Sequence, residues 1–401
     1  MPPTNSYNAH KPPSPGGERI GGPSEWIHQC VGRVEAFWQR VTEGLELQEL
    51  WRRFKAEAHA SYALYSKEVD WESFKKESRA RRLLKIGRAL FWAMILKLSP
   101  ARRVFLLLGL ALLALALAGG WSSRGSSGPA ILLSAGSLLL LLALELADRV
   151  TMKRDLEIAR EIQHWLVPEV PPEAPGVDIA FATRPANTVA GDYYDAFLRT
   201  ADTGTSTPGR LLLAVADVAG KGVPAALLMA TFQASLHTLA GAPTSLLDLV
   251  AGLNRYACAH SLGGQRFTTA FLAELDPVTR TLSYINAGHN APVLRRVSGG
   301  IERLEAGGLP LGIRSQTRYD SGTTTLDRGD LLVIFTDGLV EAESESGAEY
   351  GDLRLFDVLK EIPDGSASQQ LQRLMDSVDS FVGHARQHDD ITCLILLVES
   401  G

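Results

Sequence analysis

Two long apolar runs in the middle of the chain constrain its fold more than any other feature. They are Val104–Trp121 and Ile131–Ala147, and neither has a polar face. Each is about as long as a helix that crosses a ~30 Å hydrocarbon layer at ~1.5 Å per residue. Both lie too far from the N-terminus to be a signal peptide. The runs therefore predict a transmembrane helical hairpin over residues 101–148 rather than two buried core helices.

Basic residues beside this hairpin predict its orientation. Lysines and arginines are dense between Lys75 and Arg103, and more follow from Arg149 to Arg154, whereas the connecting loop carries only Arg124. The positive-inside rule places both flanks in the cytoplasm, so the chain is expected to be a multi-pass protein of the inner (cytoplasmic) membrane. The three cysteines show neither disulfide nor metal-ligand spacing, which agrees with a reducing compartment. A net charge of −5 gives no overall basic footprint for nucleic acid.

The segment before the hairpin divides into two parts. Residues 1–23 are rich in proline and glycine and lack an apolar period, which predicts a disordered tail. Residues 24–100 show helical apolar spacing and are expected to form a cytoplasmic helical region, without a ligand-binding signature. Their basic stretch 75–88 either rests on anionic membrane lipid or is an ordinary solvated face.

A helix and a proline-rich linker, together residues 149–176, follow the hairpin. Apolar side chains recur on one face of residues 148–166, and Pro168 is expected to end this helix. The helix is a candidate for pairing in a homodimer, although it covers only about two or three heptads. A separate domain is expected over residues 177–401.

This last domain shows apolar strands, then two long helical stretches, then strands again. The helical stretches begin near Pro224 and Ser245, and residues 267–297 alternate as a β-hairpin would, with Asp276 and Pro277 near its turn. Strands flanked by helices in this order predict an α+β sandwich rather than a doubly wound fold.

Four acidic sites of this domain are expected at the ends of apolar strands, in or beside turns. They are Asp192 in AGDYYD, Asp217 in ADVAGKG, Asp337 in FTDGL, and the pair Asp389 and Asp390 in HDDIT. An isolated aspartate in such a place is usually a cap or turn residue. Four sites without matching basic residues in the motifs predict a bound cation, because clustered carboxylates repel one another. All-oxygen ligands favour Mg²⁺ or Mn²⁺ over zinc.

The turn after Asp217 contains Gly220, Gly222 and Pro224. It is either a plain strand-to-helix connection, with the proline in the first helical turn, or a place where glycine lets the backbone approach something that Asp217 holds. This motif alone leaves both interpretations open. In the metal interpretation, two ions can polarise a phosphoryl oxygen and activate a water molecule.

Six motifs in a fixed order, together with the helix before them, resemble the SpoIIE/RsbU branch of the metal-dependent (PPM-type) serine/threonine phosphatases. The motifs are AGDYYD, ADVAGKGVPAALLMA, NAGHNAPVL, GGLPLG, FTDGLVEA and DDIT. The resemblance covers about residues 150–400. It implies an αββα sandwich that removes phosphate from phosphoserine or phosphothreonine on a protein, with a centre of two Mn²⁺ or Mg²⁺ ions.

The resemblance also implies roles for individual residues. Asp217 would bridge the two ions, and the backbone carbonyl of Val218 would add a ligand. Asp337 and Asp389 would hold one ion, and Asp192 would position the other ion or its waters.

A supporting role next to these ligands is implied for Asp390. One position departs from the animal members of the family, which have a histidine two residues after the bridging aspartate; this chain has Ala219 there. His289 is the alternative candidate for the proton donor, although a histidine in such a turn is more often structural.

The leading hypothesis is a membrane-anchored phosphatase that acts on a cytoplasmic phosphoprotein in bacterial signalling. The resemblance implies an anti-sigma-factor antagonist, or a similar small regulator, as the substrate. A catalytically silent module of the same fold that binds partners is the alternative, and filled aspartate positions disfavour it. A two-metal phosphodiesterase is a third hypothesis, but such enzymes usually recruit histidine ligands.

Overall fold

The computed structural model describes residues 98–119, 128–199, 209–260, 266–362 and 365–399. The expected tail 1–23 and nearly all of the expected region 24–100 lie outside the described residues. In sequence, the chain divides into two compact units between Leu144 and Glu145.

Two antiparallel apolar helices form the described part of the first unit. These are α4 (Pro100–Gly119) and the first part of α5 (Gly128–Leu166). The buried Ser134 hydroxyl donates a hydrogen bond to the Gly109 carbonyl at 2.8 Å. A Cβ added at Gly109 would lie 3.2 Å from Leu138 Cδ2, so this glycine lets the two helices approach closely.

By length and composition, three helices among the described residues could cross a membrane: Pro100–Ala118, Gly128–Leu166 and Val223–Ala240. The first two carry the apolar runs of the sequence. The third is α6 (Val223–Ala240), which buries Met229 and Leu236 in the core of the second unit. Its apolar composition is therefore accounted for by packing against a sheet.

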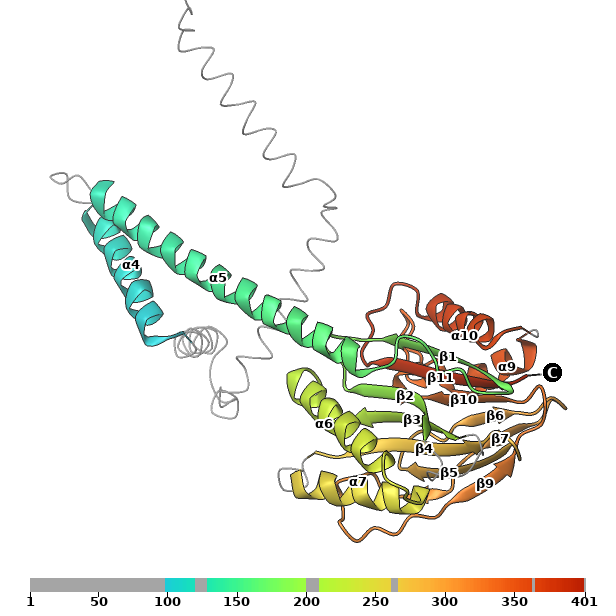
Figure 1. The fold of residues 1–401 in the computed structure, drawn as a ribbon. Helices are drawn as coiled ribbons and strands as arrows, with labels where there is room; N and C mark the ends of the chain where they lie inside the picture. The colour runs from blue at the N-terminus through green and yellow to red at the C-terminus, as the bar shows by residue number, and fades with distance from the viewer. Residues whose placement is uncertain (1–97, 120–127, 200–208, 261–265, 363–364, 400–401) are drawn as a thin grey trace, which may run out of the picture. The chain divides into compact units, whose positions relative to one another are not determined.

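The second unit is an αββα sandwich, as the sequence predicted (Figure 1). One sheet, the β11 sheet, has the order β1-β11-β10-β6-β7, and the other, the β3 sheet, has the order β2-β3-β4-β5-β8 with β9 also paired to β5. The β11 sheet consists of β1 (Val177–Arg184), β11 (Ile391–Val398), β10 (Leu331–Phe335), β6 (Val293–Arg295) and β7 (Ile301–Arg303). The β3 sheet consists of β2 (Asp192–Arg199), β3 (Arg210–Val218), β4 (Thr268–Asp276), β5 (Thr281–Ala287), β8 (Gly307–Gly308) and β9 (Gly322–Thr325).

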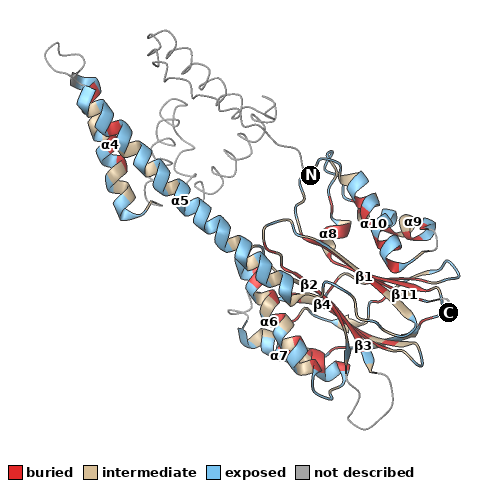
Figure 2. Cartoon of the chain, turned by 45° about the horizontal axis from the view of Figure 1, so that its top comes forward, coloured by how far each residue is buried: buried red, intermediate tan, exposed pale blue. Residues whose placement is uncertain are grey.

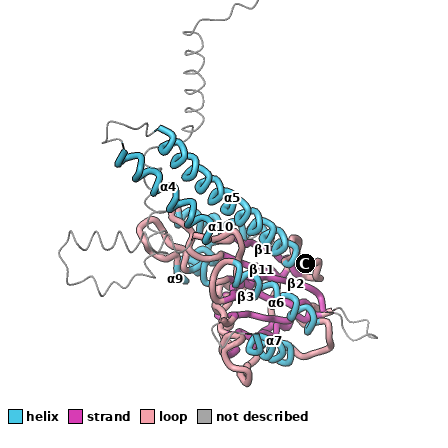
Figure 3. Tube along the Cα trace, turned by 90° about the vertical axis from the view of Figure 1, so that its left-hand side faces the viewer, coloured by secondary structure: helices cyan, strands magenta, loops and turns pink. Residues whose placement is uncertain are grey.

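Helices cover the outer face of each sheet, as the side view in Figure 3 also shows. Helices α6 and α7 (Leu246–His260) pack on the β3 sheet. Helices α9 (Gly351–Glu361) and α10 (Ala367–Val382) cover the β11 sheet. The short helix α8 (Asp337–Val340) precedes α9 in the chain and begins two residues after the end of β10.

The side chains of β3 alternate between its two faces, so this one strand contributes to two layers of the core. Leu211, Leu213 and Val215 point between the sheets, whereas Leu212 and Ala214 point toward α6 and α7. Strand β11 alternates in the same way between the inter-sheet layer and the layer under α10. Figure 2 shows the result, with buried residues concentrated on the strands and exposed residues on the outer sides of the helices.

The sequence-based expectations differ from the structure at three places. Asp192 begins β2 rather than ending a strand. Asp337 was expected at the end of a strand, but that strand, β10, ends at Phe335, and Asp337 starts helix α8. Helices α9 and α10 were not predicted, although α10 begins with a capping box formed by Ser366 and Gln369.

Candidate metal centre

Antiparallel pairing brings the first two predicted aspartates to the same edge of the β3 sheet. Asp217 lies near the end of β3, Asp192 begins β2, and the two residues are direct partners in the register. The turn beyond Asp217 needs glycine, because Gly220 and Gly222 have φ values of +116° and +74°. Pro224 then occupies the first turn of α6, as predicted.

The other aspartates approach Asp192 and Asp217 from the β11 sheet, and antiparallel pairing again brings them together. Asp337 is the second residue after β10, while Asp389 and Asp390 are the two residues before β11, which runs antiparallel to β10. The ends of the two strands therefore lie side by side. Residues far apart in the sequence thus converge at one end of the sandwich, from both of its sheets.

The carboxyl groups of these aspartates act on one another through their charges and their burial. Burial, followed by the charges of Asp337, Asp389 and Asp390, raises the pKa of Asp217 to about 7. Burial and the charge of Asp217 raise the pKa of Asp192 well above its ordinary value. Each carboxylate thus makes ionisation of its neighbours less favourable, which is the condition that a bound cation relieves.

Two of the aspartates are held by hydrogen bonds from the chain. The Asp390 carboxylate accepts from the backbone N–H of Ala186 at 2.7 Å and of Gly191 at 2.8 Å, which ties down the loop before β2. The Thr336 hydroxyl donates to Asp192 Oδ2 at 2.8 Å, across the two sheets. These bonds fix the Asp192 side chain and the loop that precedes it, and Thr336 was not singled out from the sequence.

The donor set fits a hard divalent cation. It consists of carboxylates and a backbone carbonyl, the oxygen ligands that Mg²⁺ and Mn²⁺ prefer. A Cβ added at Gly191 would lie 3.1 Å from the Val218 carbonyl oxygen and 3.6 Å from Asp217 Oδ1, so glycine leaves space beside both proposed donors. Among the described residues, no three acidic, histidine or cysteine side chains are arranged, as they stand, to hold one metal ion.

The expectation that the motifs carry no matching basic residue is wrong. Lys221, inside the ADVAGKG motif, donates to Asp389 Oδ2 at 2.8 Å and to the His388 carbonyl at 2.7 Å. The bond to Asp389 raises the pKa of Lys221 above its ordinary value. Sequence reasoning missed the pair because its members are 168 residues apart.

Two further residues near the site were missed. Burial and the charge of Asp337 raise the pKa of Glu341, which lies one turn further along the FTDGLVEA motif. Gln163 of α5 accepts from the backbone N–H of Ala190 at 3.1 Å and donates to the carbonyl of the same residue at 2.9 Å. Gln163 therefore joins the helix before the domain to the loop that ends at Asp192.

His289 has the properties of a structural residue. It is buried, and its backbone N–H and carbonyl both bond to the Asn286 side chain, at 2.7 and 2.9 Å. Burial lowers the pKa of its imidazole to about 4, so the ring is neutral at pH 7 and has no imidazolium proton to give. This disfavours His289 as the donor of a proton to a leaving group.

Comparisons with known proteins bear on the family and the fold of this domain. The family model "Stage II sporulation protein E (SpoIIE)" matches residues 207–399. The phosphoserine phosphatase RsbU of Bacillus subtilis is 29% identical over 61% of this chain and 70% of its own length. Protein IcfG of Synechocystis is 27% identical over 67% of this chain, and the match spans 45% of IcfG. The SiaA-PP2C domain of Pseudomonas aeruginosa superposes with a TM-score of 0.53 at 21% identity, over 62% of this chain and 98% of that one.

The arrangement of sheets and helices defines the class of the second unit, which has a PP2C-like phosphatase fold. Within this class, the domain belongs to the SpoIIE/RsbU branch of the PPM-type phosphatases. It is a protein serine/threonine phosphatase domain, in a class of enzymes that use divalent metal ions.

Proposed function

We propose that the protein is a membrane-anchored phosphatase that hydrolyses phosphoserine or phosphothreonine on a small cytoplasmic regulatory protein in bacterial signalling. The observation that carries this proposal is the register pairing of Asp192 with Asp217, beside the strand ends that bear Asp337 and Asp389. An anti-sigma-factor antagonist, or a similar small regulator, is the proposed substrate, as the family resemblance implies, and similarity to the phosphoserine phosphatase RsbU supports a phosphoserine protein.

The proposed metal-site roles follow the family resemblance. In this assignment Asp217 would bind both Mn²⁺ or Mg²⁺ ions, the Val218 carbonyl would add a ligand, Asp337 and Asp389 would hold one ion, and Asp192 would position the other ion or its waters. When bound, the two ions supply charge stabilisation for the phosphoryl group and a water molecule of lowered pKa. This assignment agrees with the oxygen donor set and with the space that Gly191 leaves.

The residues around these ligands have supporting tasks. Asp390 fixes the loop before β2 through its bonds to Ala186 and Gly191, and Thr336 orients Asp192. Ala219 stands where animal members have histidine, and His289 is neutral at pH 7. We therefore propose that water, rather than His289, protonates the serine oxygen that leaves.

Membrane anchoring is supported by the surface of the first unit. Large apolar side chains along α4 and α5 are exposed, including Val104, Leu115 and Leu132, of which Leu132 exposes 74% of its surface. Aqueous solvent disfavours such a surface, whereas lipid tails cover it at no comparable cost. The basic flanks support a cytoplasmic position for the phosphatase domain.

The test is hydrolysis by the purified full chain with Mn²⁺ present. We expect release of inorganic phosphate from a phosphoserine peptide and from p-nitrophenyl phosphate, and loss of this release with EDTA. Preference for a cyclic dinucleotide would instead indicate a two-metal phosphodiesterase. No hydrolysis of any of these substrates would favour the catalytically silent binding module.

A further inference from the structure

Lys221 lies where the backbone turns from the acidic edge into helix α6. Its neighbours Gly220 and Gly222 both have positive φ, so this turn is confined to conformations that side-chain-bearing residues rarely adopt. The Lys221 ammonium reaches across to the β11 sheet, where it bonds to Asp389 Oδ2 and to the His388 carbonyl. Its side chain is nevertheless 52% exposed.

A groove with a volume of about 270 Å³ opens beside this ammonium. Its lining includes Arg184, Lys221, Glu341, Asp379, Arg386 and Asp389. Arg184 is bonded to Asp379 within the groove wall. Lys221 differs from Arg184 because its partner is a proposed metal ligand, so its positive charge lies where the groove meets the acidic edge.

The hydrogen-bonding capacity of Lys221 exceeds its observed bonds. A protonated lysine carries three N–H donors. Asp389 and the His388 carbonyl account for two acceptors. A further donor is therefore available to an anion in the groove, while the two existing bonds keep the ammonium in position.

We propose that Lys221 is a substrate-binding residue that donates a hydrogen bond to a phosphoryl oxygen of the phosphoserine or phosphothreonine side chain in this groove. The inference rests on the proposed function, since it takes a phosphate ester as the occupant. A phosphate monoester is a dianion that must approach several carboxylates, and a fixed ammonium at their edge offsets that repulsion. Asp389 then has a second task, because it orients the lysine as well as serving as a proposed metal ligand.

The test uses the full chain at saturating Mn²⁺ and measures the affinity for inorganic phosphate, by calorimetry and as a competitive inhibitor. We expect Lys221→Met to weaken phosphate binding about 10- to 100-fold and to raise KM for a phosphoserine peptide, since a hydrogen bond to a charged group is lost. Lys221→Arg, which keeps the charge, should stay within about threefold of the wild type. Lys360→Met, at an exposed lysine on α9, is the matched control and should change nothing.

A second readout separates phosphate binding from a purely structural ion pair. Mn²⁺ affinity, measured by calorimetry without phosphate, should not fall in Lys221→Met, because a cation does not help another cation to bind. Weaker Mn²⁺ binding combined with unchanged phosphate affinity would show that Lys221 only positions Asp389, and would overturn the proposal. Thermal unfolding checks the fold of each variant, and Lys221→Gln replaces the methionine variant if that one unfolds.

The proposal and the proposed function can fail separately. If the wild type binds phosphate in a Lys221-dependent way but does not hydrolyse the phosphoserine peptide, the proposed function is wrong and the binding site stands. If hydrolysis occurs and the Lys221→Met variant keeps both its phosphate affinity and its KM, the proposed function stands and this inference is wrong.

Discussion

The carboxyl group of Asp217 lies among other carboxyl groups, and its burial together with their charges raises its pKa to about 7. The substitution Asp217→Asn keeps the shape of the side chain and removes the charge that would bridge two cations. We expect Mn²⁺-dependent kcat/KM to fall roughly 10²–10³-fold or more, the scale on which loss of one electrostatic element acts. Circular dichroism should show an intact fold. Normal activity in this variant would refute the metal assignment, and unfolding would favour a structural cap.

The raised pKa of Asp217 also predicts how stability depends on pH when metal is removed with EDTA. A carboxyl group whose pKa is higher in the folded state binds its proton more tightly there, so its stabilising contribution is lost as the pH rises toward about 7. Burial moves the pKa of Asp192 and Asp337 in the same direction. We expect the melting temperature to fall between about pH 5 and pH 7.5.

Two comparisons test this explanation. The Asp217→Asn variant should show a flatter profile, because the titrating group is gone, and excess Mn²⁺ should restore stability at the higher pH. A melting temperature of the EDTA-treated wild type that rises over this range would contradict the assigned pKa shifts.

At this scale, the sequence predicted the acidic residues but not what surrounds them. Asp192, Asp217, Asp337, Asp389 and Asp390 could be found because each lies in a short motif with its own turn. The contacts of Lys221 and Thr336 could not, because their partners lie 168 and 144 residues away. Only the pairing of strands from distant segments brings these side chains together.

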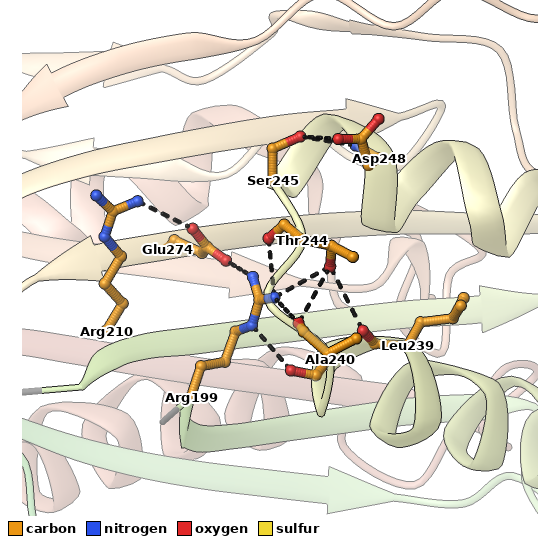
Figure 4. A network of polar contacts seen from close by, with 9 residues as sticks. Arg199, Arg210, Leu239, Ala240, Thr244, Ser245, Asp248 and Glu274 are labelled. Carbon is orange, nitrogen blue, oxygen red and sulfur yellow. Dashed lines mark hydrogen bonds and ion pairs between the residues drawn. The ribbon is translucent and has the colours of Figure 1, made fainter. Parts of the chain in front are cut away.

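At the scale of elements, one arginine fixes the loop between α6 and α7 to the β3 sheet. Arg199, at the end of β2, donates to the carbonyls of Ala240, Ala242 and Thr244 at 3.2, 3.0 and 2.9 Å (Figure 4). It also forms a buried ion pair with Glu274, whose side chain is 5% exposed. The helix that starts beside Asp217 is therefore held at its far end by a charged network.

Loss of this arginine should destabilise the domain strongly. We expect Arg199→Met to lower the free energy of unfolding by about 3–5 kcal/mol, because Glu274 would be left as a buried charge. The remaining partner of Glu274 would be Arg210, whose guanidinium nitrogen is 3.6 Å from the Glu274 carboxylate and whose side chain is mostly exposed. Urea unfolding, followed by a spectroscopic signal of the phosphatase domain, measures this change in the free energy of unfolding. The control Lys153→Met removes an exposed ion pair with Glu157 and should lower the free energy of unfolding by less than about 1 kcal/mol. An equal loss of stability in the two variants would contradict a stabilising role of the Arg199 network.

Elements were predicted well where the apolar pattern was strong. β3, β10 and β11 are continuous apolar runs, and α6 is bounded by a glycine turn and a proline. Helices α9 and α10 were missed because their apolar residues, such as Leu355 and Leu359, are interspersed with charged ones. The spacing of three or four residues and the Ser366 capping box were the signals that could have revealed them.

For the whole molecule, the proposed membrane topology rests on the basic residues that flank the apolar hairpin. In a chain with Cys30 and Cys258 replaced by serine, we expect Ser126→Cys to react with an impermeant thiol reagent added to intact cells. Ser298→Cys, at an exposed position of the phosphatase domain, should react only after lysis. Labelling of the second position in intact cells would contradict a cytoplasmic phosphatase domain.

Helix α5 continues without a break from the second apolar run to Leu166, and its last turns present an apolar stripe. Ile158, Ile162 and Trp165 recur at helical spacing, and Trp165 exposes 79% of its surface. A second copy of the same stripe is the proposed partner, in a homodimer. Gln163, adjacent to the stripe, holds the Ala190 backbone just before Asp192. Pairing of the helix can therefore influence the acidic edge through a short chain of contacts.

The substitution Ile162→Asp tests this coupling, because it places a charge in the stripe and leaves every metal-site residue in place. We expect it to lower the dimer fraction in sedimentation and to reduce kcat by roughly 5- to 150-fold at saturating Mn²⁺, which corresponds to a coupling of about 1–3 kcal/mol. Arg160→Asp adds the same side chain at an exposed position on the opposite face, so it should preserve both dimer and activity. Mn²⁺ affinity should be unchanged in both variants. If Ile162→Asp is monomeric and fully active, the helix is only a tether between membrane and enzyme.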